Sequence, residues 1–172
     1  MIIAIDGPAA SGKSTTAKLV AEKLKITYLD TGAMYRALTL HLLKSNIDFN
    51  NVDKVSTILD NLSIEMYDYK GRNIIKLNNE DITEKIRSSN VTENVSAVSA
   101  LLIVRQSMVV MQRQIGNKTD CVVEGRDIGT IVFPNADYKF FMIADIKMRA
   151  NRRLNEMNQL GADKTYDEMV SD

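Results

Sequence analysis

This 172-residue sequence has a single cysteine, no excess of charge of either sign and no long apolar run. Cys121 is the only cysteine, so no intrachain disulfide can form and an intracellular setting is favoured. Lys plus Arg and Asp plus Glu number 22 each, which gives electrostatic binding of DNA or an anionic membrane little support. No apolar run approaches the roughly 20 residues of a spanning helix, and the N-terminus lacks a signal-peptide pattern. We therefore predict a cytoplasmic monomer without nucleic-acid or membrane partners.

The length and composition fit one soluble globular domain. The chain is 45% hydrophobic and 26% charged, which is typical of folded proteins rather than of disordered or fibrous ones. It is long enough to bury a sizeable core and to carry an inserted subdomain, but not two large independent domains. Because the overall charge is balanced, any recognition of an anion must come from a local site.

Short apolar runs alternate with helical patterns along the chain. Continuous apolar runs predict strands that are buried on both faces, whereas apolar residues three or four apart predict helices. Their order predicts an α/β fold, a P-loop three-layer sandwich with a mostly parallel central sheet. The predicted strands cover residues 2–5, 26–30, 121–124 and 138–144, and the predicted helices include 13–24, 34–42, 55–62, 91–98, 104–115 and 150–157.

The period changes to two between Leu62 and Leu77. Ile64 and Met66 alternate with polar residues, DYKGRN supplies a turn, and the alternation resumes at Ile75. The segment NNEDI then offers a second turn. We therefore predict a small antiparallel β insertion, at about residues 62–87, in an otherwise parallel domain.

The segment GPAASGKS satisfies the pattern G-x-x-x-x-G-K-[ST] between a predicted strand and a predicted helix. Glycines let backbone N–H groups crowd around a phosphate, and a helix N-terminus favours negative charge. Lys13 is expected to reach the β- and γ-phosphates, and Ser14 to offer its hydroxyl to Mg²⁺. We predict that the loop binds a nucleoside triphosphate, with Mg²⁺ as cofactor. The predicted binding residues are Gly7, Pro8, Ala9, Ala10, Ser11, Gly12, Lys13, Ser14 and Thr15.

A charged segment, EGRDIGT, follows the third predicted strand. A carboxylate at a strand end that faces a phosphate loop is well placed to bind a magnesium-bound water, so Glu124 is a candidate metal residue. Arg126 is a candidate phosphate donor, and Asp127 is an acceptor suited to an exocyclic amine. A plain polar turn is the competing interpretation.

The segment DTGAMYR places Thr31 and Arg36 at the start of a helix, near the edge where open parallel sheets bind ligands. Arg105 and Arg126 also lie beside predicted helix or strand ends. These arginines are candidates for binding one phosphate together, although each alone is equally consistent with a solvated surface. The sequence alone does not show whether they converge.

Five segments together carry a family resemblance: IDGPAASGKST, YLDTGAMYRALT, ITEKIR, VSAVSALLIVR and EGRDIGTIVFPNADYKFFMIA. In this order, along nearly the whole chain, they resemble the bacterial cytidylate kinases. The resemblance implies ATP-dependent phosphorylation of CMP and dCMP to the diphosphates. It also implies that Arg36 and Arg126 hold the acceptor phosphate near Thr31, and that the insertion belongs to the monophosphate-binding region. Ser96, Arg105 and Asp127 are the residues that it implies for reading the cytosine.

The segment MRANRRL resembles the start of the mobile lid of such kinases, expected at about residues 149–165. The resemblance implies that its arginines contact ATP or the transferred phosphoryl group, although a solvated helix face is the alternative. Relatives are expected to continue past Asp172 into further lid arginines, a strand and a helix, and a chain without them is expected to transfer poorly. The implied catalytic set is Lys13, Arg126, Arg149 and Arg153.

Other functions stay open on the residues alone. A kinase for UMP or AMP is the nearest alternative, and a P-loop ATPase or regulatory nucleotide-binding protein is a more distant one. The arginines on the acceptor side and the β insertion argue against the latter. No general base is evident, and none is required, because a phosphate oxygen is already a nucleophile.

Overall fold

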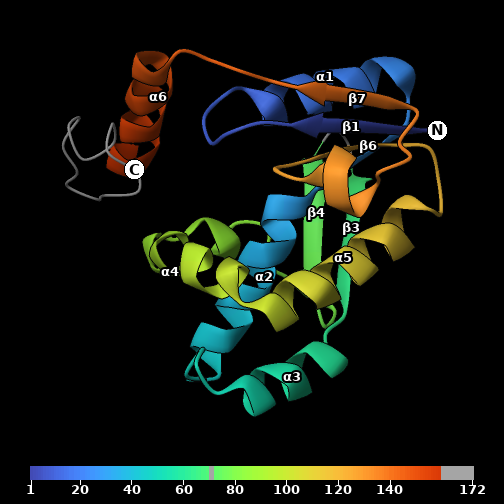
Figure 1. The fold of residues 1–172 in the computed structure, drawn as a ribbon. Coiled ribbons are helices and arrows are strands. Elements are labelled where there is room, and N and C mark those ends of the chain that lie inside the picture. Colours follow the sequence, from blue (N-terminus) through green and yellow to red (C-terminus); the bar gives the residue numbers. More distant parts are fainter. Residues whose placement is uncertain (70–71, 160–172) are drawn as a thin grey trace.

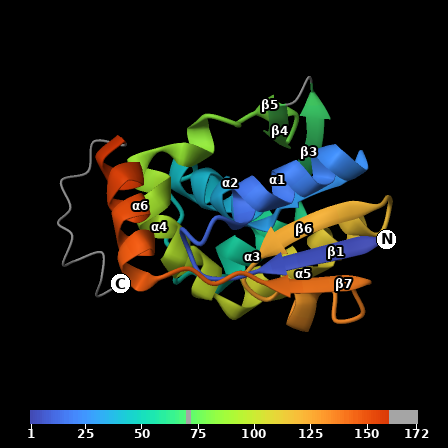
Figure 2. The ribbon, with the colours of Figure 1, turned by 90° about the horizontal axis from the view of Figure 1, so that it is seen from above.

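The computed structural model describes residues 1–69 and 72–159. A parallel sheet lies at the centre of the fold. The strand order is β2-β6-β1-β7, and each neighbouring pair is parallel (Figures 1 and 2). The predicted fold class is confirmed. The strands are β1 (Ile2–Asp6), β2 (Thr27–Asp30), β6 (Cys121–Gly125) and β7 (Tyr138–Phe141).

Helices cover both faces of this sheet. Helix α1 (Lys13–Leu24) packs on one face, where Ala17 and Ala21 meet Val122 (Figure 2). Helices α2 (Thr31–Lys44) and α5 (Leu102–Gly116) lie on the other face (Figure 1). The predicted helix at residues 13–24 agrees with α1 residue for residue, because its apolar spacing and its glycine boundary are both local signals.

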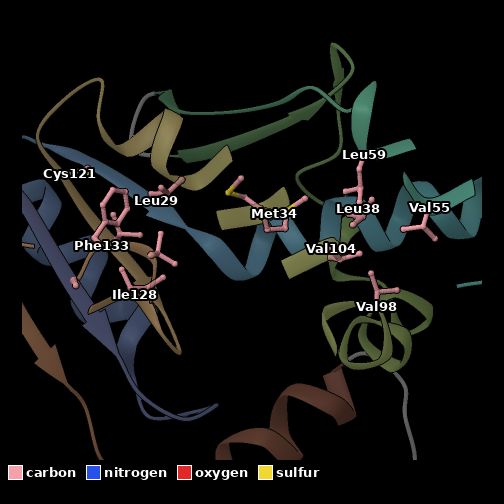
Figure 3. Close-up of a cluster of buried hydrophobic side chains, with 14 of the residues drawn as sticks. Leu29, Met34, Leu38, Val55, Leu59, Val98, Val104, Cys121, Ile128 and Phe133 are labelled. Carbon is pink, nitrogen blue, oxygen red and sulfur yellow. The ribbon is translucent and has the colours of Figure 1, made fainter. Parts of the chain in front are cut away.

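The main core runs from the sheet along α2 to α3 (Val52–Asp60). Figure 3 shows it extending from Cys121 and Phe133, past Met34 in the middle, to Leu59. The thiol of Cys121 is buried, and this burial raises the pKa of the thiol to about 11. The lone cysteine is therefore a core residue in its protonated form.

The insertion forms a sheet of its own rather than extending the parallel one. Its strands are β3 (Ile64–Tyr69), β4 (Arg72–Leu77) and the short β5 (Glu80–Asp81), in that order and antiparallel. Ile64 pairs with Leu77, so the predicted antiparallel hairpin is confirmed. The 3₁₀ helix η1 (Lys85–Arg87) leads from this sheet to α4 (Ser89–Ala100).

Helices α4 and α5 meet at an angle of 96°. In the described part of the chain, no single helix has the length and apolar character needed to cross a membrane. Helices α4 and α5, which are bent relative to each other, have that length and apolar character only when the two are counted as one segment. Val98, Val104 and Met108 from this pair are buried in the main core.

The fourth strand is shorter than predicted. The apolar run suggested a strand over residues 138–144, but β7 ends at Phe141. Its partner β1 ends at Asp6, whose carbonyl accepts one last hydrogen bond from the Met142 N–H at 2.7 Å. Beyond that point no neighbouring backbone within residues 1–69 and 72–159 continues the ladder, and the chain crosses to α6 (Ile146–Gln159). The Asp145 carboxylate caps α6 by accepting from the Lys147 N–H at 2.9 Å.

Asp6 joins the end of β1 to the segment after β6. Its two carboxylate oxygens accept hydrogen bonds from the Ile128 and Gly129 N–H groups at 2.7 and 2.8 Å, at the start of the π-helical segment η2 (Ile128–Val132). The carboxylate is buried, 7% exposed, so these bonds are protected from water. They fix the EGRDIGT segment against the strand that carries the phosphate loop.

Replacing Asp6 with asparagine should lower the free energy of unfolding by about 2 kcal/mol. Asparagine has a single carbonyl oxygen, so its amide group would face one of the two N–H donors. Urea unfolding with an unchanged m-value measures the effect. The control is Asp60→Asn at the exposed end of α3, which should change stability by less than about 0.5 kcal/mol. Equal effects in the two variants would contradict this role of Asp6.

Candidate active site

The carboxyl ends of all four parallel strands lie at one edge of the sheet, where ligands of open α/β sheets bind. The glycine loop follows β1, and α2 follows β2 directly. Arg126 and Asp127 follow β6, and the segment leading to α6 follows β7. The topology therefore brings three other parts of the sequence next to the loop.

Two glycines allow the loop to take its shape. Gly7 has a φ of 152°, and a Cβ there would lie 2.3 Å from the Met142 carbonyl oxygen, which no side chain can tolerate. Gly12 has a φ of 97° and stands at the N-cap of α1. The loop therefore ends on free N–H groups of a helix N-terminus, which attract anions. The Ser11 hydroxyl is buried in the loop without a hydrogen-bond partner among the described residues.

Lys13 lies across this loop. Its ammonium donates to the Pro8 carbonyl at 2.7 Å. Desolvation lowers the pKa of Lys13, the nearby charge of Arg126 lowers it further, and Glu124 opposes both. Glu124 in β6 and Arg126 just after it are thus among the charges that act on the lysine of the loop.

Glu124 lies at the end of β6 with both carboxylate oxygens engaged. Ser14 donates to Oε2 at 3.0 Å, and the Tyr28 hydroxyl donates to Oε1. Burial raises the pKa of Glu124, and the charge of Asp30 raises it further. The hydroxyl and carboxylate oxygens gathered here are the hard ligands that Mg²⁺ prefers, so Ser14 and Glu124 fit the predicted metal role.

Arg36 projects from α2 toward the insertion. Its Nη1 donates to the Thr92 hydroxyl at 2.9 Å and to the Ile86 carbonyl at 3.3 Å. Burial lowers the pKa of Arg36, and the charges of Arg153 and Arg87 lower it further, while Asp30 opposes them. The charges of two other arginines therefore act on Arg36, as expected of a site for a polyanion.

A cavity of about 510 Å³ lies beside this arginine group, between the inserted sheet and the start of α2. Its lining includes Asp30 from β2, Arg72 from β4 and Arg87 from η1. Asp30 and Arg87 are also the neighbours whose charges act on Arg36. The cavity therefore opens next to the candidate phosphate site.

Arg105 on α5 forms an ion pair with Asp127 after β6. Tyr35 is close to both, because their charges act on its hydroxyl, although burial is the main reason that its pKa is raised. Among the described residues, Ser96 has no side-chain contact to this pair; it is exposed on α4, and its carbonyl accepts from the Ser99 hydroxyl. The structure thus brings together two of the three residues expected to read the base.

Thr31 and Arg126 differ in their surroundings. Thr31 is buried, and its hydroxyl donates to the Glu124 carbonyl at 2.7 Å, which ties α2 to β6. Arg126 is exposed and makes no ion pair within the described residues. Arg126 is therefore free to bind a ligand, whereas the Thr31 hydroxyl already has an acceptor.

The arginines of α6 reach the phosphate loop. Arg149 donates to the Ala9 carbonyl at 3.0 Å and Arg152 to the Ala10 carbonyl at 3.1 Å, while Arg153 pairs with Glu156 at 3.2 Å. Figure 2 shows α6 crossing the edge of the sheet at which the strands end. Residues 160–165 of the predicted lid lie outside the described residues.

Three residues of this site were missed as site residues by the reasoning from the sequence: Asp6, Tyr28 and Thr92. Asp6 directly precedes the first glycine of the loop, and a buried carboxylate there was a usable signal. Arg152 was among the lid arginines of MRANRRL that the resemblance pointed to, but it was left out of the implied catalytic set. Tyr28 and Thr92 act through partners 96 and 56 residues away, so no local pattern could reveal them.

The loop between β1 and α1 and the parallel sheet that carries it define a P-loop protein of the α/β class. The sequence profile described as cytidylate kinase matches residues 3–172. A cytidylate kinase of Clostridioides difficile (strain 630) is 51% identical over 172 residues, which cover the whole chain and 78% of that relative. Cytidylate kinases of Fusobacterium nucleatum and Bacillus subtilis (strain 168) are 47% and 44% identical over 170 residues, 99% of this chain and 76% of each relative.

The chain belongs to the cytidylate kinase family. The predicted resemblance is confirmed, and the chain is a kinase, a transferase of phosphoryl groups. A P-loop ATPase or a regulatory nucleotide-binding protein is not favoured.

Proposed function

We propose that the chain transfers the γ-phosphoryl group of ATP to CMP and dCMP across the edge of the sheet. The observation that carries this proposal is the hydrogen bond that Ser14 of the phosphate loop donates to Glu124 at 3.0 Å, because Glu124 lies two residues before Arg126. The triphosphate loop and the segment assigned to the acceptor side are therefore neighbours, so the donor and acceptor phosphates would meet between them. Positioning of the two phosphates and neutralisation of their charge then supply most of the rate acceleration.

On the donor side, residues 7–15 would bind the triphosphate of ATP. Lys13 would leave the Pro8 carbonyl and place its charge on the β- and γ-phosphates, where charge builds up during transfer. Ser14, with Glu124 acting through a water, would hold Mg²⁺, which neutralises phosphate charge when bound. Arg149 and Arg153 of α6 would approach the transferred group from the lid side. The contacts of Arg149 and Arg152 with the loop support this placement of α6.

On the acceptor side, Arg36 and Arg126 would hold the phosphate of CMP close to Thr31. The Nη1 of Arg36 is already held by two acceptors, which leaves its other N–H groups for a planar, bidentate contact with phosphate. The inserted sheet, at about residues 62–87, would act as the monophosphate-binding subdomain and close on this side. Its cavity beside Asp30 and Arg87 supports that role.

Arg105 and Asp127 would recognise the base, with Ser96 joining them. Cytosine presents its N4 amine as a donor and its N3 and O2 as acceptors, which match a carboxylate and a guanidinium. Uracil has a carbonyl at C4, so the Asp127 carboxylate and uracil O4 would both be acceptors and no hydrogen bond could form between them. Leaving such buried polar groups unpaired is an effective way to reject an analogue.

Asp127→Asn should therefore lower the preference for CMP over UMP by about 10-fold to 100-fold, because an asparagine amide can donate to uracil O4. The measurement is the ratio of kcat/KM values for CMP, dCMP, UMP and AMP, with ADP release followed in the absence of acceptor as well. Asp60→Asn, on the far side of α3, serves as the matched control. An unchanged CMP to UMP ratio in the Asp127 variant would rule out this role.

The location and assembly of the enzyme stay as proposals. We propose a cytoplasmic monomer with nucleotides as partners; the balance of 22 basic and 22 acidic residues gives binding of nucleic acid or of an anionic membrane little electrostatic support.

A further inference from the structure

Tyr28 lies on the same face of the sheet as the Glu124 carboxylate, to which its hydroxyl donates. In the parallel pair β2 and β6, Tyr28 is opposite Val122 and Asp30 is opposite Glu124. Side chains two residues apart along a strand share a face, so Tyr28 and Asp30 lie on the α1 side with Val122. Asp30 and Glu124 are thus direct cross-strand neighbours at the edge where the phosphate loop begins.

Two neighbouring carboxylates repel each other, and burial increases this repulsion. Asp30 accepts a hydrogen bond from the Ala33 N–H at 3.0 Å, which fixes it as the N-cap of α2. Glu124 has no such backbone donor in the described residues, and only the hydroxyls of Tyr28 and Ser14 donate to its carboxylate. The orientation of Glu124 therefore depends on these two hydroxyls.

Several features make Tyr28 a reliable donor. Its ring packs against the apolar cluster below α1 and lies 5.6 Å from the Lys18 ammonium, measured to the ring centroid. The Tyr28 hydroxyl donates to Oε1 of Glu124. The packing of the ring therefore gives the phenol a fixed position from which to donate.

The position of the Glu124 carboxylate in turn determines the orientation of the Ser14 hydroxyl. Because the Ser14 hydroxyl donates its proton to Oε2, its oxygen lone pairs face away from the carboxylate and are available to a cation. Groups that orient metal ligands in this way change metal affinity although they do not touch the metal.

We propose that Tyr28 is a positioning residue that holds Glu124 against Ser14 and so orients the Ser14 hydroxyl toward Mg²⁺. The proposal rests on the metal role given above to Ser14 and Glu124. It concerns a residue outside the phosphate loop and outside the set expected to touch either nucleotide.

The experiment measures binding rather than turnover. Isothermal titration calorimetry with a non-hydrolysable ATP analogue, in excess Mg²⁺ and in EDTA, gives the factor by which Mg²⁺ tightens binding. In Tyr28→Phe, which keeps the ring and removes only the hydroxyl, this factor should fall about 10-fold, within the range seen for residues that orient metal ligands. Binding in EDTA should stay within about 2-fold of the parent, since Tyr28 would act only through the metal site. Tyr138→Phe, at an exposed position of β7, should leave both values unchanged.

A double mutant tests whether Tyr28 acts through Glu124. In a Glu124→Gln background, Tyr28→Phe should produce no further loss, because the group that it orients has changed. A lower melting temperature with an unchanged Mg²⁺ factor would overturn the proposal and leave Tyr28 a structural residue. If Glu124→Gln itself leaves the Mg²⁺ factor unchanged, the metal role of Glu124 fails and the Tyr28 proposal fails with it. The kinase assignment is judged separately by turnover with CMP.

Discussion

Lys13→Met should lower kcat for phosphoryl transfer by about 10³-fold or more, the largest loss expected for any single residue of this enzyme. The side chain of methionine has nearly the same length, so the variant removes the charge and little of the volume. The lysine charge would be most valuable in the transition state, where negative charge spreads over the transferred phosphoryl oxygens. We therefore expect the fold-decrease in kcat to be larger than the fold-increase in KM for ATP.

The fold should tolerate this change. Lys13 is half-buried, desolvation disfavours its charge, and its one described hydrogen bond goes to the Pro8 carbonyl. Replacing it with an apolar side chain should change the melting temperature by only about 2 °C. Lys23→Met in the exposed last turn of the same helix is the matched control and should keep full activity. If Lys13→Met retained more than about a tenth of the parent kcat, the lysine would not carry the charge neutralisation assigned to it.

The parts of the site predicted well from the sequence are those encoded over a short stretch. The phosphate loop depends on glycines at two positions, a lysine and a hydroxyl within eight residues, and each of these constraints is local. The backbone confirms them: a side chain at Gly7 would collide with the Met142 carbonyl, and Gly12 has a positive φ. The helix that follows was equally clear, because its apolar spacing begins directly after the loop.

Features that depend on strand register could not be predicted. The segment ITYLD shows a tyrosine in a strand, where aromatic residues are common and suggest only packing. That Tyr28 donates to Glu124 follows from the pairing of β2 with β6, which are separated by more than 90 residues. The repulsion between Asp30 and Glu124 follows from the same pairing.

The mutual contacts of the side chains expected on the acceptor side were not foreseen. Arg105 and Asp127 were expected to read the base, and in the structure they form an ion pair with each other. Thr31 was expected near the acceptor phosphate, and its hydroxyl donates to the Glu124 carbonyl. Such contacts depend on how α2, α5 and β6 pack, and the residue types alone leave several arrangements open.

Arg36 should have the largest effect on the acceptor side. We expect Arg36→Met to raise KM for CMP about 100-fold and to lower kcat/KM by about 10³-fold, since two charge-assisted hydrogen bonds to phosphate would be lost. KM for ATP should change by less than about 3-fold, because the triphosphate loop does not involve this residue. Arg36→Lys should recover only part of the loss, because an ammonium cannot form the bidentate contact. Steady-state kinetics with each substrate varied in turn separates these values.

A control is needed because Arg36 also ties α2 to η1 and α4 through Ile86 and Thr92. Arg113 on α5 offers the matched case: its guanidinium donates to the Val132 and Ile131 carbonyls at 2.8 and 2.7 Å, and it is assigned no substrate. Arg113→Met should lower stability by about 1 to 3 kcal/mol while leaving both KM values unchanged. If Arg36→Met behaved in the same way, its role would be structural and the acceptor phosphate would have to be held by Arg126 alone. A selective rise in KM for CMP, absent from the Arg113 variant, would instead mean that the same guanidinium fixes the inserted sheet and binds the substrate. Closure of the insertion and capture of the phosphate would then depend on one side chain.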